Sequence, residues 1–167
     1  MVIWLMGISG AGKTTIGQRL AAFFEERGVS FYLLDSDELR DLFDRDLGYG
    51  HADRVANLKR VITAAYVLER CGITVIVCNV SHLEHIRQLA RQKLSDYREI
   101  YLKKDIDSAI KDDVRGIYTS NIGKSEIIGL DVEFELPTVP DLVLDTDELT
   151  EDETFMRLIA YIEKIGA

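Results

Sequence analysis

The sequence predicts an α/β fold in which helices cover both faces of a parallel sheet of five strands. Short, unbroken apolar runs alternate with segments of helical periodicity along the whole chain, and strands that are apolar throughout are typical of parallel sheets buried on both faces. A glycine-rich segment separates the first apolar run from the first helical pattern. The 167 residues contain no linker and no repeat, so we expect one domain over residues 1–167.

The first half of the chain contains three predicted strands. They are the apolar runs at residues 2–6, 31–34 and 73–78. Between the first two strands, the spacing of Ile16, Leu20 and Phe24 predicts a helix. A short helix is expected over residues 36–43 and a long helix over 51–70.

The second half adds two predicted strands and three helices. Helical patterns cover residues 83–94 and 106–112, and short apolar strands lie at 99–102 and 142–144. A capping box, formed by Thr150 and Glu153, opens the last helix. The apolar side chains that this helix is expected to bury are Phe155, Leu158, Ile159, Ile162 and Ile165.

Residues 115–140 do not fit the alternating pattern. The segment has weak periodicity, scattered glycines and both prolines of the chain, Pro137 and Pro140. An irregular segment of this length in a compact domain is usually a functional loop. We therefore interpret it as a lid over an active site, against the alternative of a surface excursion without a role.

The overall charge limits the classes of partner. The net charge is −9 and the pI is about 4.8, which argues against broad binding to nucleic acid or to an anionic membrane. We expect no signal peptide, and the sequence contains no apolar run long enough to span a bilayer. We expect a cytoplasmic protein whose anion-binding surface is a local basic patch.

The cysteines and histidines favour structural or solvated roles. Cys71 and Cys78 have the spacing of neither a metal motif nor a disulfide framework, so we expect small core residues in a reducing compartment. His51, His82 and His85 have no partners at metal-ligand spacing. We expect these three side chains to be solvated polar residues.

The glycine-rich segment is a phosphate-binding motif. Residues 7–14 fit G-x-x-x-x-G-K-[ST] between a predicted strand and a predicted helix, so Lys13 can reach terminal phosphates and Thr14 can ligate Mg²⁺. The predicted ATP-binding residues are Gly7, Ser9, Gly10, Ala11, Gly12, Lys13, Thr14 and Thr15, with Arg115 added from the start of the irregular segment. The alternative is a glycine-rich turn without a ligand.

Two carboxylates follow the second strand and suggest the reaction type. Asp35 and Asp37 lie at a strand end, and the carboxyl ends of parallel strands form the ligand-binding edge of a sheet. Beside a terminal phosphate, they can hold Mg²⁺ and accept a proton from an attacking hydroxyl. The third strand ends at Asn79 without a carboxylate. This pattern favours a small-molecule kinase in which Lys13, Asp35 and Asp37 are catalytic and Thr14 and Asp35 hold the metal. Which of the two aspartates is the base stays open. The alternative is that either aspartate only caps the following helix.

Basic residues on the next two helices predict a second anion site. Arg40 lies on the short helix, and Arg54, Asn57 and Arg60 lie on the long one, with Arg54 and Asn57 three residues apart on one stripe. Arginines near a phosphate site are candidates for the phosphate or sulfate of an acceptor. Tyr49 could stack on a base. The alternatives are a solvated helix face with ordinary ion pairs and a packed loop aromatic.

These motifs, taken together, resemble the adenylylsulfate (APS) kinase family. The resemblance rests on the segments Gly7–Thr14, Leu34–Arg40, Asp46–Tyr49, Asp53-Arg54 with Asn57, Gly116–Tyr118, Gly129–Asp131 and Leu142–Thr146, which follow in the family's order. It implies a three-layer P-loop kinase fold with a five-stranded sheet, a mobile lid and usually a homodimer. It also implies a MgATP-dependent enzyme of sulfate assimilation that phosphorylates the ribose 3′-hydroxyl of APS.

In the acceptor site that the resemblance implies, some residues match the family pattern and others depart from it. The matching residues are Asp35, Asp37, Arg40, Arg54 and Asn57, while Tyr49 stands for a Phe and Ser81 fits a family serine. Other positions depart from the family pattern. This chain has Ser36 where the family has Gly, Glu38 where it has Asn, and Ile127 where it has the Phe that helps to sandwich adenine. His82 also departs from the family's ISPF/Y segment, and residues 131–135 depart from its DDPYE segment. The implied acceptor-binding residues are Asp37, Arg40, Tyr49, Arg54, Asn57, Ser81 and Ile127.

Two other functions remain open from the sequence. The first keeps the chemistry and changes the acceptor to another activated nucleotide, such as a cytidine diphosphoramidate used for surface polysaccharides, because Ile127 is compatible with a different base. The second is a non-catalytic nucleotide-binding module. The retention of Lys13, Thr14, Asp35 and Asp37 argues against the second.

Overall fold

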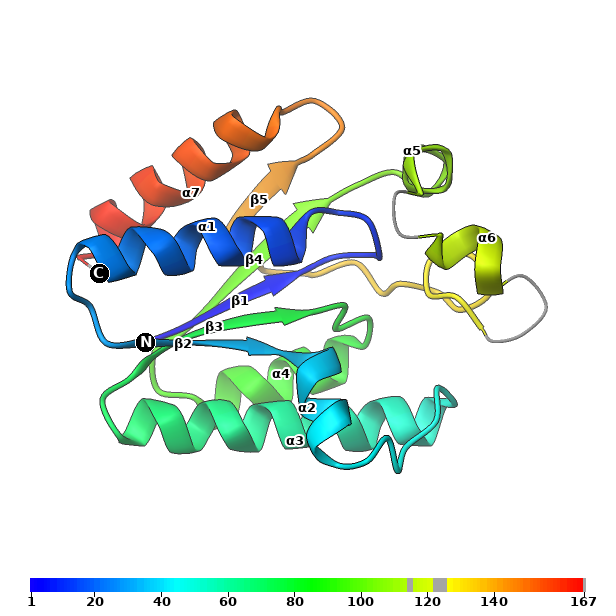
Figure 1. The fold of residues 1–167 in the computed structure, drawn as a ribbon, viewed down its shortest axis with the longest axis horizontal. Helices are drawn as coiled ribbons and strands as arrows, with labels where there is room; N and C mark the ends of the chain where they lie inside the picture. The colour runs from blue at the N-terminus through cyan, green and yellow to red at the C-terminus, as the bar shows by residue number, and fades with distance from the viewer. Residues whose placement is uncertain (114–115, 122–125, 167) are drawn as a thin grey trace.

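The protein, described here by a computed structural model for residues 1–113, 116–121 and 126–166, contains a five-stranded sheet between two layers of helices (Figure 1). The strand order is β2-β3-β1-β4-β5, and every neighbouring pair is parallel. The strands are β1 (Val2–Met6), β2 (Phe31–Asp35), β3 (Thr74–Asn79), β4 (Tyr97–Lys103) and β5 (Leu142–Asp145). The predicted fold class and number of strands are confirmed.

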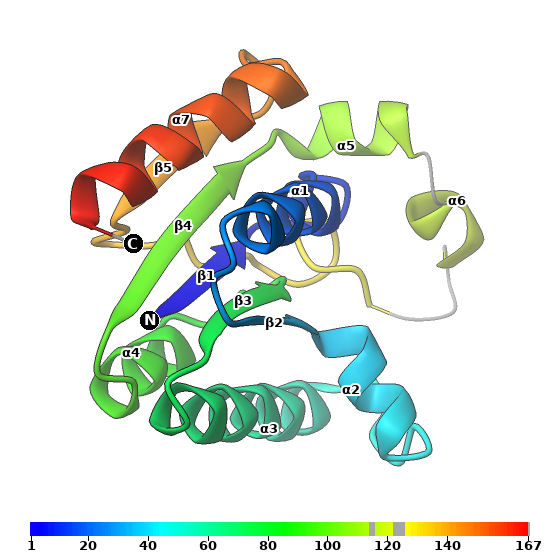
Figure 2. The same cartoon turned by 60° about the vertical axis from the view of Figure 1, so that its left-hand side comes forward.

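Helices cover the two faces of the sheet. They are α1 (Lys13–Glu26), α2 (Ser36–Leu42), α3 (His51–Arg70), α4 (Glu84–Lys93), α5 (Ile106–Asp112), α6 (Ile117–Asn121) and α7 (Glu151–Ile165). Figure 2 shows α1 and α7 on one face and α3 and α4 on the other. Within the described residues, no helix has the length and apolar character that crossing a membrane would require.

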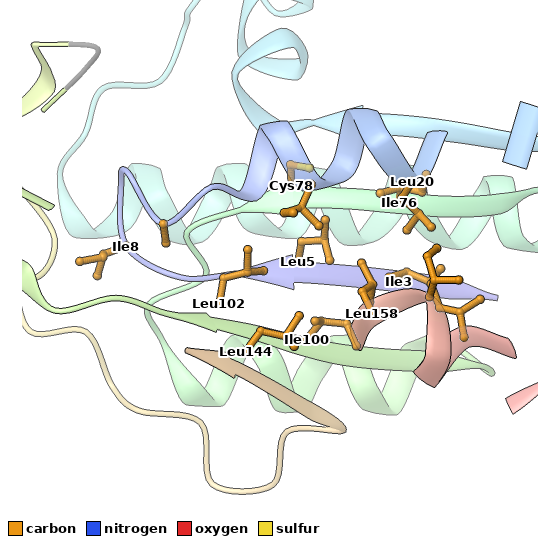
Figure 3. Packing of buried hydrophobic residues seen from close by; sticks show 14 of the residues in the cluster. Ile3, Leu5, Ile8, Leu20, Ile76, Cys78, Ile100, Leu102, Leu144 and Leu158 are labelled. Carbon is orange, nitrogen blue, oxygen red and sulfur yellow. The ribbon is translucent and has the colours of Figure 1, made fainter. Parts of the chain in front are cut away.

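The central strand divides its side chains between two cores. All five residues of β1 are buried. Because side chains alternate along a strand, Ile3 and Leu5 pack with α1 and α7, as Figure 3 shows, whereas Val2, Trp4 and Met6 pack with α3 and α4. This is the reason why the strand is apolar throughout.

Some boundaries and burial predictions are wrong. β4 begins at Tyr97, two residues earlier than predicted. Residues 115–140 are not wholly irregular, because α6 lies within them. Cys78 is buried as predicted but Cys71 is exposed, since it follows the last turn of α3 at the surface. The capping box on α7 is confirmed, although Phe155 and Ile165 are only partly buried.

The topology places the candidate site at one edge of the sheet. β3 lies between β1 and β2 and is parallel to both. Met6 pairs with Asn79 and Asp35 pairs with Cys78, so the three strands end within one residue of each other. Ligands of open parallel sheets bind at this carboxyl edge, where neighbouring connections diverge. Here β1 lies between β3 and β4, so the loop after β1 lies at that divergence.

Candidate active site

One cavity of about 550 Å³ collects most of the predicted site residues. The predicted residues that line it are Ser9, Gly10, Gly12, Lys13, Thr14, Thr15, Asp35, Asp37, Arg40, Tyr49, Arg54, Asn57, Ser81 and Ile127. Gly7 and Ala11 shape the loop without lining the cavity, and Arg60 pairs with Asp46 instead. Arg115 lies outside the described residues.

The loop between β1 and α1 has a backbone that requires its glycines. Gly10 and Gly12 have φ of +83° and +86°, a region that disfavours residues with a side chain. At Gly7, an added Cβ would lie 2.3 Å from the backbone oxygen of Leu102. The loop leads directly into α1, so its backbone N–H groups and the positive end of the helix can bind an anion.

Lys13 and Tyr118 brace this loop. The Lys13 ammonium donates a hydrogen bond to the Ile8 carbonyl oxygen at 2.7 Å, and the Tyr118 hydroxyl donates to the Ser9 carbonyl oxygen at 2.8 Å. Burial raises the pKa of Tyr118 to about 12, so its proton stays available for that bond. Because Tyr118 belongs to α6, the start of the predicted lid contacts the phosphate loop, a contact that the sequence did not predict.

Asp35 caps a helix and also lines the cavity. Its Oδ1 accepts a hydrogen bond from the Asp37 backbone N–H at 2.9 Å, which caps α2. Asp37 and Lys13 line the same cavity. A carboxylate has two oxygens and several lone pairs, so capping and a role toward a ligand are compatible at Asp35.

Two arginines hold the loop that carries Tyr49. Arg40 Nη1 donates to the carbonyl oxygens of Leu47 and Gly48, each at 3.1 Å, while Arg54 Nε donates to the Tyr49 carbonyl oxygen at 2.5 Å. The Tyr49 ring lies 4.8 Å from the Arg40 guanidinium carbon and is half exposed. Burial, and then the charge of Arg40, lowers the pKa of Arg54. An anion bound between the two guanidinium groups would offset this repulsion.

Two buried polar atoms on the cavity wall have no hydrogen-bond partner within the part of the chain that the structure describes. They are Asn57 Oδ1 and His82 Nε2. Only 1% of the His82 surface is exposed, so the expectation of a solvated side chain is wrong; His51 and His85 are exposed as expected. Burial, and then the nearby charge of Arg54, lowers the His82 pKa to about 4, so the imidazole is neutral near pH 7.

The Ser81 hydroxyl is committed to buried hydrogen bonds. It accepts from the Trp4 indole at 2.7 Å and donates to Asn79 Oδ1 at 2.9 Å. The Ser81 backbone has φ of +50°, and its N–H also donates to Asn79 Oδ1 at 2.7 Å. Asn79 therefore fixes the turn after β3, a role that its place at a strand end could have suggested.

The residues present fit a magnesium ion that arrives with a nucleotide. Among the described residues, no three His, Cys, Asp or Glu side chains gather as a metal site. Thr14 and Asp35 nevertheless line one cavity. Mg²⁺ usually takes one or two protein oxygens and completes its shell with water and phosphate, so this sparse set is compatible with it.

Comparisons with known proteins point to one family. A model of the family described as adenylylsulphate kinase matches residues 1–145. The chain is 36% identical over 167 residues to the adenylyl-sulfate kinase of Pseudomonas aeruginosa, covering 97% of this chain and 85% of that protein. It is 33% identical over 168 residues to the adenylyl-sulfate kinase of Bacillus pumilus, with coverage of 98% and 85%.

A solved structure agrees with these matches. The Mycobacterium tuberculosis APS kinase CysC in complex with AMPPNP and APS has a TM-score of 0.89 and 32% sequence identity to this chain. The comparison covers 97% of this chain and 96% of that one. The likeness therefore extends over the whole fold, including the elements that form the cavity.

Proposed function

This chain belongs to the adenylylsulphate kinase family, and from that premise we propose how its cavity transfers a phosphoryl group from MgATP to the ribose 3′-hydroxyl of APS. The protein is an ATP-dependent adenylyl-sulfate kinase. The residue assignments rest on one observation: the phosphate loop lines the same cavity as the basic side chains Arg40 and Arg54.

The donor half binds ATP through the loop between β1 and α1. Backbone N–H groups of the loop bind phosphate oxygens, and Lys13 exchanges its bond with the Ile8 carbonyl for the terminal phosphates. Bound with ATP, Mg²⁺ would be held by Thr14 and Asp35 and would neutralise charge on the phosphates. Arg115 stays a predicted ATP ligand.

The transfer requires one proton acceptor. The ribose hydroxyl oxygen forms a bond to the terminal phosphorus, the bond from that phosphorus to the bridging oxygen breaks, and ADP leaves with the electron pair. Asp35 or Asp37 accepts the hydroxyl proton, since both line the cavity with Lys13. The buried Cys78 thiol nearby does not compete, because burial raises its pKa to about 12.

The acceptor half binds APS through its anion and its base. Arg54 and Arg40 bind the phosphosulfate, whose negative charge offsets their mutual repulsion. Tyr49 and Ile127 contact the adenine, and Asn57 accepts a hydrogen bond through its unpaired oxygen. The Ser81 hydroxyl is already hydrogen-bonded within the protein. Ser81 therefore acts on the acceptor indirectly, by fixing the turn that lines the cavity.

The alternative acceptor, a cytidine diphosphoramidate, has weaker support. The relatives named above are adenylyl-sulfate kinases, and the Mycobacterium tuberculosis relative was solved with APS. These findings favour APS over the alternative. The non-catalytic module has no observation in its favour, because Lys13, Thr14, Asp35 and Asp37 all line the cavity.

Steady-state kinetics of Arg54→Ala tests the acceptor site. We expect the KM for APS to rise roughly ten- to a hundredfold, which corresponds to about 1.5–3 kcal/mol for a lost charge-assisted contact, with the KM for ATP nearly unchanged. Arg60→Ala is the matched control, since Arg60 lies on the same helix but pairs with Asp46 outside the cavity. Equal effects of the two variants would refute the assignment.

We also propose that the protein is a cytoplasmic homodimer, as the family resemblance implies. The absence of a metal or disulfide arrangement for its two free cysteines is compatible with a reducing compartment. Sedimentation equilibrium across a concentration series tests the quaternary state. A single species with the mass of one chain, 18.9 kDa, would refute the dimer.

A further inference from the structure

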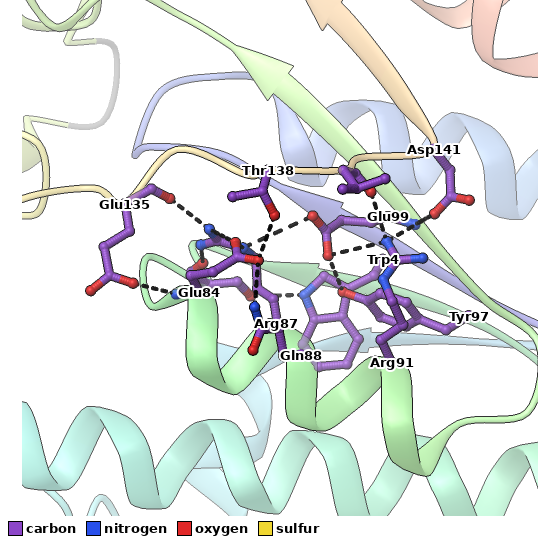
Figure 4. Close-up of polar contacts among 12 residues, drawn as sticks. Trp4, Glu84, Arg87, Gln88, Arg91, Tyr97, Glu99, Glu135, Thr138 and Asp141 are labelled. Carbon is purple, nitrogen blue, oxygen red and sulfur yellow. Dashed lines mark hydrogen bonds and ion pairs between the residues drawn. The ribbon is translucent and has the colours of Figure 1, made fainter.

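A buried arginine outside the cavity joins two segments that line it. The Arg87 side chain is 1% exposed, which is rare for arginine unless its charge and donors are satisfied. Arg87 does not line the cavity. Figure 4 shows its guanidinium at the centre of a polar network between α4 and the chain that leads into β5.

The two ends of the guanidinium bind different segments. Nη1 donates to the Ser81 carbonyl oxygen at 2.7 Å, and Nη2 donates to the Glu135 carbonyl oxygen at 2.7 Å. Glu84 receives hydrogen bonds from Nε and Nη2 and balances the charge. The fork of Arg87 therefore sets the separation between the turn after β3 and residues 133–138, which we name the lid-base segment.

Further contacts strengthen the same connection. The Glu135 carboxylate accepts a hydrogen bond from the Glu84 backbone N–H at 2.5 Å, and the Glu135 N–H donates to the His82 carbonyl oxygen at 3.0 Å. Thr138 donates to Glu84 Oε1 at 3.0 Å. Phe134 stacks on Tyr101 with ring centroids 5.8 Å apart. The lid-base segment is thus attached to the body of the protein chiefly around Arg87.

Both connected segments continue directly into the part of the cavity wall that we assign to the acceptor. Ser81 and His82 line the cavity on one side of the connection, and Ile127 and Ile128 line it on the other. A tight turn links Ile127 to the lid-base segment, since the Ile127 carbonyl oxygen accepts from Leu130, Asp131 and Val132. A shift at Arg87 would therefore move both parts of the wall relative to α3.

We propose that Arg87 is a positioning residue for APS binding, which sets the distance between the turn at residues 80–82 and the wall at residues 127–128. The proposal rests on the assignment of this half of the cavity to APS. ATP binds at the loop between β1 and α1, which makes no contact with Arg87. Lysine keeps the charge but lacks the planar fork that bonds two carbonyls at once.

The test compares Arg87→Lys with Arg91→Lys. Arg91 lies one turn later on α4 and also reaches the chain before β5, bonding the Val139 carbonyl oxygen and Asp141, but it touches neither turn 80–82 nor the lid-base segment. We expect Arg87→Lys to raise the KM for APS at least tenfold with the KM for ATP within twofold, and Arg91→Lys to leave both within twofold. Equal effects on the two KM values, or no effect on the APS value, would overturn the proposal.

Hydrogen exchange of the amides supplies a readout that is independent of the substrate. Arg87→Lys should accelerate exchange in residues 80–83 and 127–136, while exchange in α1 stays unchanged. Should this variant fail to fold, Thr138→Val loosens the same segment from an exposed position, and it should accelerate exchange and raise the APS KM in the same direction. Wild-type protein that does not phosphorylate APS would refute the proposed function, whereas unchanged exchange would refute the role of Arg87.

Discussion

His82 should make folding stability depend on pH between 7.5 and 4.5. Its usual pKa of 6.5 is lowered to about 4 in the folded protein by burial and by the nearby Arg54 charge. The unfolded chain therefore binds a proton at a higher pH than the folded chain. Stability from this residue is fully present above pH 6.5 and is lost as the pH falls toward 4.

The size of the effect follows from the two pKa values. A shift of this size corresponds to about 3 kcal/mol in full, of which about 2.5 kcal/mol is lost by pH 4.5. That is a large share of the roughly 5–15 kcal/mol that stabilises a typical domain. Glu135 opposes the shift, and Arg87 and His51 add to it, so the wild-type curve alone does not isolate His82.

The contribution of His82 can be isolated by chemical denaturation of the wild-type protein and of His82→Gln at a series of pH values. Glutamine keeps polar atoms at this position without titrating, so the wild-type advantage over the variant should shrink by about 2.5 kcal/mol between pH 7.5 and 4.5. His85→Gln, at an exposed position in α4, should give a curve parallel to wild type. Parallel curves for His82→Gln as well would refute the reasoning, because they would place the imidazole in contact with water.

The remaining predictions concern the reaction. Lys13→Ala should reduce turnover by at least ~100-fold while circular dichroism stays that of wild type, because a positioned cation is lost from the transferred group; near-normal turnover would contradict the loop assignment. Asp35→Asn and Asp37→Asn should each lower kcat far more than they weaken ATP binding measured by calorimetry, and two fully active variants would remove both from the mechanism. Ile127→Phe should lower the KM for APS by several-fold, since added stacking contributes ~1 kcal/mol; a higher KM for APS would indicate a wall shaped for another base.

The fold was predictable because its signals are local. Each strand contains a short apolar run, and α3 and α5 have the predicted bounds, His51–Arg70 and Ile106–Asp112. The start of β4 was missed because the charged Arg98 and Glu99 interrupt its pattern. The Thr150–Glu153 capping box needs only residues three apart, and it is present. The short helix α6 was missed because five residues, Ile117–Asn121, make little more than one turn and show no period.

Residue positions in the site were predictable where a motif fixes them. Asp35 ends β2, and Lys13 begins α1 after the loop that follows β1; parallel strands bring those strand ends to one edge. His82 was not predictable in the same way, because its burial depends on the Glu135 backbone, which pairs with it from far along the chain. Arg87 likewise has no local signal, since its partners Ser81 and Glu135 come from separate segments.

The unpaired polar atoms distinguish the two halves of the cavity. In the donor half, Lys13 bonds the Ile8 carbonyl and Tyr118 bonds the Ser9 carbonyl. In the half that we assign to the acceptor, Asn57 Oδ1 and His82 Nε2 are buried without hydrogen-bond partners among the described residues, and each such atom costs about 1–3 kcal/mol. Lys13 and Tyr118 thus bond to the protein in the half that we assign to ATP, whereas a bound acceptor could supply the hydrogen bonds that Asn57 Oδ1 and His82 Nε2 lack among the described residues. His82 stands where the family pattern that the sequence resembles has proline, so this chain carries a buried imidazole in the half of the cavity that we assign to the acceptor. We therefore expect selection among acceptors to depend on which ligand pairs with His82 Nε2.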